Sequence, residues 1–569
     1  MTRWLPGSLA LLVLLAACDG EVVPAGDADT GPLPDGASAP GPDGAPAPMD
    51  AGTDGEVPPG AVAVAARLPD GRLGEPTTTF TLPAVDEGMG MYIPDLQDRF
   101  PEVDWETLDR LYIPAGHYPF IRLGNLPARD RDARPLVVTN LGGQVRVGGL
   151  GHHYLFVIEG GSGFVLSGRY DPVSRTGDAA FPGHRDNAYA SSAGRYGFLI
   201  DDAHAESGRS GLGVGGGASD FELEFIEIRG VGFAGMLIKT DDDASATMRD
   251  VWIHDNYIHD TVSEGMYLGS TQSQPQHTLE GFDVSFNRVL RAGTESIQLG
   301  QLAGDNEVHH NVFGPSAIDW RDAFQRFQDG NLQVSIRSGV TRVHHNVFLG
   351  AAGSMVGLFG NDVPGDAHAA GDGVIVEDNY LGHFRNLAVY GIARDVEPLT
   401  FTIANNEIRG HHFDRDEVYT DATPPGHMIR QGNGATDFEV RGNRFDDGDR
   451  LCSPVPAECN GEATGFIGAD NEMVSLPPIA FRDAGLPDDF DYLSLELWTD
   501  VASLGGDAPV TYPSGDVVMY EGAPYRCVAD PCPAGAVPDV SPESWEPMEA
   551  FADDVRATGA HASLGLGDG

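Results

Sequence analysis

The stretch VHHNVF stands at residues 308–313 and is repeated letter for letter at residues 343–348. Each copy has an aliphatic residue, two variable positions, an asparagine, one further variable position and an apolar residue. Segments with this pattern carry their asparagine at Asn256, Asn287, Asn311, Asn346, Asn379, Asn406 and Asn443. Seven matches at spacings of 24 to 37 residues indicate a repeat architecture. Ile226 occupies the equivalent place 30 residues ahead of Asn256.

The repeat unit consists of strand-like segments and Gly-rich turns, without an apolar run at helical period. One such unit cannot close a hydrophobic core, whereas a coil of stacked rungs can, because each strand bonds to the rungs above and below. Asparagine tolerates the left-handed conformation of a sharp bend, and its amide can bond to the same amide one rung away. We therefore predict an elongated parallel coil with Asn311 and Asn346 at equivalent corners.

With these repeats the chain resembles the right-handed parallel β-helix family, the pectate-lyase-like superfold. Upstream segments that resemble its opening rungs are LYIPAGHYPFIRLGNL (111–126), RPLVVTNLGGQVRVGG (134–149) and LFVIEGGSGFVLSGRYD (155–171). The resemblance covers roughly residues 75–480 and implies an all-β, right-handed parallel β-helix domain, which we place at residues 64–485. This architecture hosts lyases, hydrolases, epimerases and non-catalytic fibres, so the fold alone does not name an activity.

Charge excludes some partners of this chain of 569 residues. Its net charge of −50 would repel phosphate backbones and anionic lipid surfaces, which argues against nucleic acid as a partner. Lys239 is the single lysine among 35 basic residues. One interpretation is that a genome of high GC content encodes arginine in place of lysine. The other is that Lys239 is retained for the chemistry of its amine.

The N-terminus resembles a bacterial lipoprotein signal peptide. Arg3 precedes the apolar run LALLVLLAAC (9–18), which is too short to span a bilayer. The lipobox of that family is matched by Leu15, Ala16, Ala17 and Cys18. The resemblance implies removal of the signal within residues 1–18 and acylation of Cys18, which would hold the protein at the bacterial outer membrane or cell surface. The alternative is an ordinary secretory segment with a chance cysteine.

Residues 19–63 and 551–569 are expected to lie outside the folded domains. The first of these segments is acidic and rich in Pro, Gly and Ala, so it cannot bury enough apolar area to order itself. It is predicted to be an extended tether between the anchor and the folded part. The second is expected to be a flexible tail.

Cysteine use agrees with export. Besides Cys18, the chain has four cysteines in two close pairs, Cys452 with Cys459 and Cys527 with Cys532. Loops of this length favour a disulfide within each pair in an oxidising compartment. Zinc is the competing interpretation, although neither pair has Cys-x-x-Cys spacing and no histidine cluster accompanies them.

Aligning rungs on the asparagine corner brings GFAGMLIKT (232–240), VSEGMYLGS (262–270) and GTESIQLGQ (293–301) into register. The alignment sets Glu264 over Glu295, Tyr267 over Gln298, and Lys239 over Gly269 and Gly300. Residues predicted to point inward are Met236, Ile238, Met266, Leu268, Ile297 and Leu299. Lys239, Tyr267 and Gln298 would then point outward, above two glycines expected to leave room for a ligand.

Two chemistries fit these residues. A polysaccharide lyase needs a base, which could be Lys239, Tyr267 or a histidine, and a cation such as Ca²⁺, which Asp241, Asp242 and Asp243 could hold. A hydrolase needs two carboxylates, and Glu264 and Glu295 would lie roughly 5 Å apart on neighbouring rungs, the separation of a retaining pair. Strand parity, however, groups both glutamates with the inward side chains unless a bend intervenes, and favours hydrogen-bonded turn residues.

Histidines form another column. His254, His309 and His344 each stand two places before a corner asparagine, and His310 and His345 stand one place before it. A stack of solvated polar side chains is the favoured reading, and a metal site or a catalytic base is the alternative. The insertion at 314–334 could wall a groove, with Trp320 or Phe324 stacking on a sugar.

The segment after residue 490 has a different character. YPSGDVVMYEGAPYRC (512–527) followed by VPDVSPESWEPM (537–548) resembles the type-3 chitin-binding module, carbohydrate-binding module families 5 and 12. Residues that match its motif are Tyr512, Gly515, Asp516, Val518, Tyr520, Gly522, Tyr525 and Trp545. The resemblance implies a module at 490–550 whose Tyr512, Tyr520, Tyr525 and Trp545 bind sugar. The loop CVADPCPAG (527–535) departs from the family where it presents exposed aromatics, which leaves chitin itself open.

Together these features predict an exported, monomeric surface lipoprotein that acts on a polysaccharide as a lyase or glycoside hydrolase. An acidic or a chitin-like sugar fits the candidate residues. The alternative function is a non-catalytic adhesin that binds carbohydrate, or a structural protein.

Overall fold

The structure is a computed structural model, and it describes most of the chain between residues 77 and 549. The described ranges are 77–149, 154–168, 196–202, 208–240, 243–271, 277–322, 328–360, 368–392, 399–411, 427–431, 437–446, 450–453, 466–474, 495–502 and 508–549. Cys18 and the segments expected to be signal, tether and tail lie outside these ranges. None of the helices in the described part is both long and apolar enough to cross a membrane.

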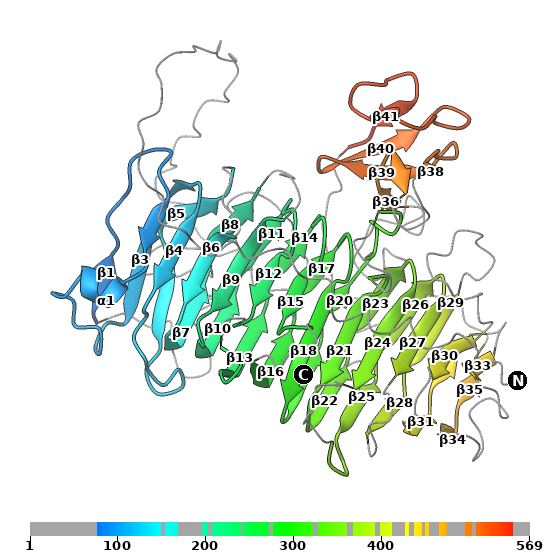
Figure 1. Ribbon diagram of the computed structural model, residues 1–569, viewed down its shortest axis with the longest axis horizontal. Helices are drawn as coiled ribbons and strands as arrows, with labels where there is room; N and C mark the ends of the chain where they lie inside the picture. Colours follow the sequence, from blue (N-terminus) through cyan, green and yellow to red (C-terminus); the bar gives the residue numbers. More distant parts are fainter. Residues whose placement is uncertain are drawn as a thin grey trace, which may run out of the picture.

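Parallel strands stack into a long coil with three ladders, which confirms the predicted parallel β-helix (Figure 1). The first ladder contains β1 (Thr79–Thr81), β3 (Arg110–Tyr118), β5 (Leu136–Val147), β7 (Ser162–Ser167), β10 (Ser219–Glu224), β13 (Thr247–His254), β16 (Thr278–Ser285), β19 (Asn306–His309), β22 (Val340–His344), β25 (Gly373–Glu377), β28 (Thr400–Ala404), β31 (Asp437–Arg441) and β34 (Phe466–Ala469).

The second ladder begins beside the C-terminal half of β5. It contains β8 (Phe198–Asp201), β11 (Ile226–Arg229), β14 (Tyr257–His259), β17 (Arg288–Leu290), β20 (Val312–Phe313), β23 (Val347–Ala351), β26 (Tyr380–Phe384), β29 (Glu407–His411), β32 (Arg444–Phe445) and β35 (Glu472–Met473).

The third ladder carries the candidate site. It contains β2 (Met91–Ile93), β4 (Ile121–Gly124), β6 (Tyr154–Glu159), β9 (Ser210–Gly215), β12 (Met236–Ile238), β15 (Met266–Leu268), β18 (Ile297–Ala303), β21 (Leu332–Ile336), β24 (Ser354–Gly360), β27 (Leu387–Ile392), β30 (His427–Gln431) and β33 (Arg450–Ser453). The helix α1 (Leu96–Arg99) lies near the N-terminal end of the coil.

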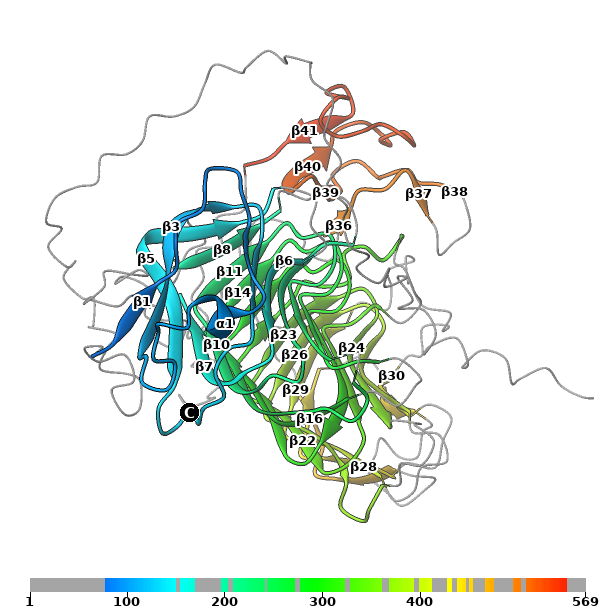
Figure 2. The same cartoon turned by 60° about the vertical axis from the view of Figure 1, so that its left-hand side comes forward.

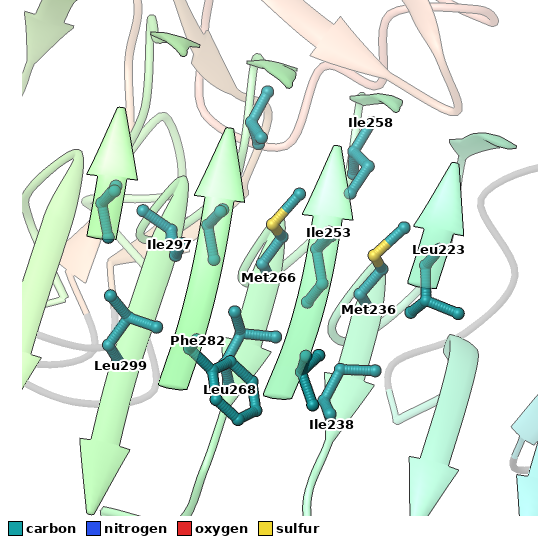
Figure 3. Close-up of a cluster of buried hydrophobic side chains, with 14 of the residues drawn as sticks. Leu223, Met236, Ile238, Ile253, Ile258, Met266, Leu268, Phe282, Ile297 and Leu299 are labelled. Carbon is teal, nitrogen blue, oxygen red and sulfur yellow. The ribbon is translucent and has the colours of Figure 1, made fainter. Parts of the chain in front are cut away.

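The core lies inside the coil, where aliphatic side chains of successive rungs stack on one another. Met236 pairs with Met266 and Met266 with Ile297, and all three side chains are buried. Figure 3 shows these side chains on one side of their strands, together with Ile238, Leu268 and Leu299. The predicted inward direction of these residues is therefore confirmed.

The asparagines form a continuous ladder at the corner between the first and second ladders of strands. The Asn311 Nδ2 donates to the Asn346 Oδ1 at 3.0 Å, and the Asn346 Nδ2 donates to the Asn379 Oδ1 at 3.0 Å. Ile226 lies in this column, because its backbone N–H donates to the Asn256 Oδ1 at 3.1 Å. The column also extends to Asn471, which the sequence pattern missed.

One physical reason given for the asparagines is wrong. The residue with left-handed backbone at this corner is the one before the asparagine, such as His310 (φ 54°) and His345 (φ 54°). The asparagine itself is required for its amide, which bonds along the column and also to backbone carbonyls, as the Asn311 Nδ2 does to the Val284 carbonyl at 2.8 Å. Buried peptide groups at the bend are satisfied in this way.

A small β module packs against the side of the coil (Figure 2). Its strands are β36 (Leu495–Leu497), β39 (Val517–Tyr520), β40 (Ala523–Cys527) and β41 (Trp545–Pro547) in one sheet, and β37 (Val501–Ala502) with β38 (Ala508–Pro509) in another. Leu495 and Met519 pack with Leu349 and Tyr380 of the coil in one apolar cluster. The Leu497 N–H donates to the Ile318 carbonyl at 2.7 Å, so backbone bonding continues from coil to module.

The predicted disulfide between Cys527 and Cys532 is confirmed, with an S–S distance of 2.06 Å. Cys452 is disulfide-bonded as well. Its predicted partner, Cys459, lies outside the described residues.

Candidate active site

Lys239, Tyr267 and Gln298 lie side by side on the outer face of the third ladder, as the rung alignment predicted. Tyr267 pairs with Gln298 across β15 and β18, and Gln298 pairs with Gln333 on β21. The Lys239 Nζ lies 4.9 Å from the centre of the Tyr267 ring, a cation–π contact. Lys239 and Gln333 are partly exposed, so this strip reaches the surface.

Thr271 links the side chains of this strip. Its Oγ1 lies 3.1 Å from the Tyr267 hydroxyl and accepts a hydrogen bond from the Gln298 Nε2 at 2.9 Å. Its backbone N–H donates to the same hydroxyl at 3.1 Å. The phenol is thus held by the turn that follows its own strand, which fixes the ring under Lys239.

The glycines of this column do not leave room for a ligand, contrary to the prediction. A Cβ on Gly269 would lie 2.0 Å from the Gly300 carbonyl oxygen, and a Cβ on Gly300 would lie 2.5 Å from the Ser270 oxygen. Gly269 also has a left-handed backbone (φ 75°). Close approach of neighbouring rungs therefore explains both glycines.

Glu264 and Glu295 lie on neighbouring rungs, each two residues before the start of β15 or β18. The Gly265 N–H donates to the Glu295 carbonyl at 2.9 Å, so the two rungs are bonded at this point. Glu264 is 1% exposed and Glu295 is 0% exposed. Rung spacing in a parallel sheet then sets the two residues about 5 Å apart.

Both glutamates are hydrogen-bonded turn residues, the interpretation that the sequence favoured, because a bend precedes each strand. The Gln333 Nε2 donates to the Glu295 Oε1, and Gln333 lies on the outer face between the core residues Leu332 and Val334. The regular alternation begins only with Met266 and Ile297, because the chain is still turning at the glutamates. Both carboxyl groups therefore belong to the same outer strip as Lys239.

The pKa is raised at both glutamates of this pair, and more strongly at Glu295. Burial and the charge of Glu264 raise the pKa of Glu295 well above its ordinary value. Burial also raises the pKa of Glu264, but a hydrogen bond from Ser263 and the positive charge of Lys239 oppose the rise. The Ser263 Oγ donates to the Glu264 Oε2 at 2.7 Å. Glu264 is thus the member that ionises more easily.

Asp329 is a third carboxyl group here, and the sequence reasoning missed it. Burial raises the pKa of Asp329 to about 7, and its charge contributes to the raised pKa of Glu295. It comes from the insertion at 314–334, so it has no counterpart in the aligned rungs. In the structure Leu332 pairs with Ile297, which aligns Gly330, next to Asp329, with Glu295.

His254 lies on the first ladder, away from the glutamates of the third. The His254 Nε2 is 3.0 Å from the Glu222 Oε1, and its Nδ1 is 2.8 Å from the Asp255 Oδ2. Burial opposes a charged imidazole, but these carboxylates raise the pKa of His254 to about 9. Glu222, Glu224 and His254 could supply ligands to one metal ion.

The histidines of the repeated stretch stack in two parallel columns. The His309 and His344 rings are 5.0 Å apart and 4° from parallel, and the His310 and His345 rings are 5.0 Å apart and 9° from parallel. The His309 Nε2 is 3.3 Å from the Asp283 Oδ1, at a partly exposed position. His309 is therefore not brought to the carboxyl pair.

The predicted Ca²⁺ ligands are described only in part. Asp241 and Asp242 lie outside the described residues. Asp243 is exposed, and its Oδ1 accepts hydrogen bonds from the Ser245 N–H at 2.9 Å and the Ser245 Oγ at 2.6 Å. These bonds lower the pKa of Asp243, and calcium binding there stays a prediction.

The module's predicted sugar-binding aromatics divide into two groups. Tyr512 and Trp545 are each 1% exposed and pack against each other at 5.3 Å, so these rings form the module's core and cannot stack on a sugar as predicted. Tyr520 and Tyr525 are partly exposed. Trp498, which the motif did not include, stands edge-to-face with Tyr520 at 5.3 Å.

Trp320 lies in the turn that carries the module. The Arg321 guanidinium is 4.1 Å from its ring centre, and the Arg385 guanidinium is 5.8 Å away. Arg321 also forms an ion pair with Glu496 of the module. Trp320 thus takes part in docking the module, and its contact with a sugar stays a prediction. Phe324 lies outside the described residues.

These observations define a parallel β-helix protein with a buried carboxyl pair on its outer face. No protein-family model matches the chain, and no curated protein matches it. A lacto-N-biosidase from Eubacterium ramulus is 9% identical, with 64% of this chain and 62% of that chain covered and a TM-score of 0.38. A tailspike protein of E. coli bacteriophage HK620, solved with a pentasaccharide, is 14% identical, with 68% and 64% covered and a TM-score of 0.39.

An alginate lyase from Paenibacillus is 13% identical, with 60% of this chain and 90% of that chain covered and a TM-score of 0.26. The chain spans less than two thirds of the length of the lacto-N-biosidase and the tailspike. Likeness at this level carries no information about activity.

Proposed function

We propose that the protein is a glycoside hydrolase that cleaves a polysaccharide with retention of configuration, using Glu264 and Glu295. The observation that supports this is the pair of carboxyl groups, one rung apart on the outer face of the third ladder. The cation of Lys239 and the amides of Gln298 and Gln333 lie on the same strip. Retaining enzymes hold their two carboxyl groups about 5 Å apart, close to the rung spacing.

The environments of the two glutamates suggest their roles. Glu295, with the more strongly raised pKa, is the general acid that protonates the glycosidic oxygen as the bond to the anomeric carbon breaks. Glu264, whose carboxylate Lys239 and Ser263 stabilise, attacks that carbon and forms a glycosyl ester. The Glu295 carboxylate then takes a proton from water, which hydrolyses the ester and restores both groups.

The burial of both glutamates sets a condition on this mechanism. A sugar reaches the carboxyl groups only if the side chains that cover them move aside on binding. A non-catalytic carbohydrate-binding adhesin is the second candidate, and the complete burial of Glu295 favours it. The lyase is the remaining alternative, and of its three predicted calcium ligands the structure describes Asp243, whose Oδ1 accepts a hydrogen bond from the Ser245 Oγ at 2.6 Å.

The expected setting of this enzyme follows from the sequence. We infer that acylation at Cys18 holds it on the bacterial cell envelope as an extracytoplasmic monomer, with the module binding the polysaccharide. Radiolabelled palmitate should label the wild-type chain and not Cys18→Ser. Absence of label from both would remove the anchor from the proposal.

The test of the function is a panel of polysaccharides, followed for new reducing ends and for the absorbance of unsaturated products. A hydrolase yields reducing ends without unsaturated products, whereas a lyase yields both. Glu264→Gln and Glu295→Gln should each abolish product, while Glu280→Gln, at a surface position 45% exposed, should not. Binding without product on every member would favour the adhesin.

A further inference from the structure

A cavity of about 220 Å³ lies between the module and the coil. Trp498 and Tyr520 line it from the module, and Thr261 and Asp319 line it from the coil. The contact that forms it is specific, because the Leu497 N–H donates to the Ile318 carbonyl and Arg321 pairs with Glu496 beside it. The cavity is therefore a feature of the docked module.

Two aromatic rings form one wall of this cavity. Trp498 and Tyr520 meet at 84° with their ring centres 5.3 Å apart, and both are partly exposed. Apolar ring faces with polar tips suit pyranose rings, whose C–H surfaces pack on the face while hydroxyl groups bond at the edge. Such a wall suits a sugar ring.

The remaining lining is strongly acidic. Among the described residues that line the cavity, Asp260, Asp319, Asp322 and Glu521 are acidic and none is basic. Asp260 is already paired with Arg291, at 2.6 and 2.9 Å. Burial and the charge of Asp322 raise the pKa of Asp319 well above its ordinary value. A cation in this cavity would relieve that unfavourable charge.

Backbone hydrogen bonds connect the coil side of the cavity to the turns that carry the carboxyl pair. The Asp319 N–H donates to the Gly293 carbonyl at 2.8 Å, and the Ala317 N–H donates to the Thr294 carbonyl at 2.8 Å. Glu295 follows Thr294 in the chain, and Thr261 stands three residues before Glu264. The cavity and the two glutamates therefore belong to the same pair of neighbouring turns.

We propose that this cavity binds a sugar unit carrying a protonated amine, so that the substrate is a polysaccharide with unacetylated amino sugars. The part of this proposal that names the substrate rests on the proposed function. The part that concerns binding in the cavity does not. The proposal replaces the acidic sugar expected from Lys239 with a cationic one, in keeping with the net charge of −50.

The experiment is calorimetric titration of the full chain carrying Glu264→Gln, which prevents cleavage, with two probes. The probes are a hexamer of glucosamine and the same hexamer fully N-acetylated. We expect the glucosamine hexamer to bind at least ten-fold more tightly. Equal binding of the two hexamers, or tighter binding of the acetylated one, would overturn the proposal.

Variants test whether the hexamers bind in this cavity. Asp319→Asn combined with Asp322→Asn should weaken the glucosamine hexamer at least ten-fold, and Trp498→Ala should weaken both hexamers. Glu543→Gln, at an exposed acid of the module outside the cavity lining, should change neither affinity. Unchanged affinity in the aspartate variant would overturn the location. Should a variant fail to fold, the comparison of the two hexamers on the parent chain decides.

The outcomes separate this proposal from the proposed function. Tight binding of the glucosamine hexamer without cleavage by the wild-type chain would contradict the hydrolase and leave the cavity proposal standing. Cleavage of a fully acetylated or acidic polymer, with no preference for glucosamine, would contradict the cavity proposal and leave the hydrolase standing.

Discussion

The Oδ1 of Asn346 accepts two hydrogen bonds from Asn311, one from its Nδ2 and one from its backbone N–H, each at 3.0 Å. The same double contact joins Asn346 to Asn379 in the next rung, at 3.0 and 2.9 Å. Each amide therefore closes the bend of its own rung and fixes the register of the next. This relationship explains why an asparagine recurs at the same place in both copies of VHHNVF.

Asn311→Ala should destabilise the coil, because it leaves buried polar groups without partners on three rungs. We expect a loss of about 2 to 4 kcal/mol in the free energy of unfolding, measured by urea denaturation. Arg342→Ala is the matched control, since it removes only a surface ion pair with Glu377 and should cost less than about 1 kcal/mol. Equal effects of the two substitutions would refute the role of the ladder.

Asp329→Asn should make stability less dependent on pH. Burial raises the pKa of Asp329 to about 7 from an ordinary 3.8, so the folded state binds its proton more strongly than the unfolded state does. This contribution is fully present below pH 3.8 and is lost as pH rises through about 7. The variant should therefore melt at a higher temperature than wild type at pH 8, with a smaller difference at pH 5. The same difference at both values would contradict this account.

His254→Gln should also change how stability depends on pH, over a higher pH range than Asp329→Asn does. Asp255 and Glu222 raise the pKa of His254 to about 9, so its contribution is fully present below pH 6.5 and is lost as pH rises through about 9. We expect the stability advantage of wild type over the variant to be larger at pH 6 than at pH 10 by about 3 kcal/mol. Thermal melts at both pH values check this, and a constant difference would show that the imidazole is not charged.

Lys239→Met should lower turnover without unfolding the coil. The substitution keeps the apolar stem over Tyr267 and removes the charge that lowers the pKa of Glu264. We expect at least a ten-fold loss of kcat and a shift of the acidic limb of the pH profile to higher pH, at an unchanged Tm. An unchanged pH profile at wild-type Tm would return Lys239 to an ordinary surface residue.

The corner column could be predicted because it depends on one residue per rung and on local chemistry. The alignment also brought Glu264 over Glu295. The direction of these side chains could not be read from parity, since the chain bends before Met266 and Ile297 begin the regular strands. Asp329 was missed because an insertion carries it. The cavity at Trp498 and Asp319 depends on docking between distant segments, for which no local pattern exists.

The most direct test of the hydrolase proposal is the configuration of the first sugar released, followed by proton NMR on whichever polysaccharide of the panel the enzyme cleaves. In the proposed mechanism the carboxyl groups of Glu264 and Glu295 keep the rung spacing of about 5 Å, which leaves no room for a water between carboxylate and sugar. We predict that the new reducing end first appears with the configuration of the bond that was cleaved. An inverted product, or an unsaturated one, would contradict the proposed mechanism.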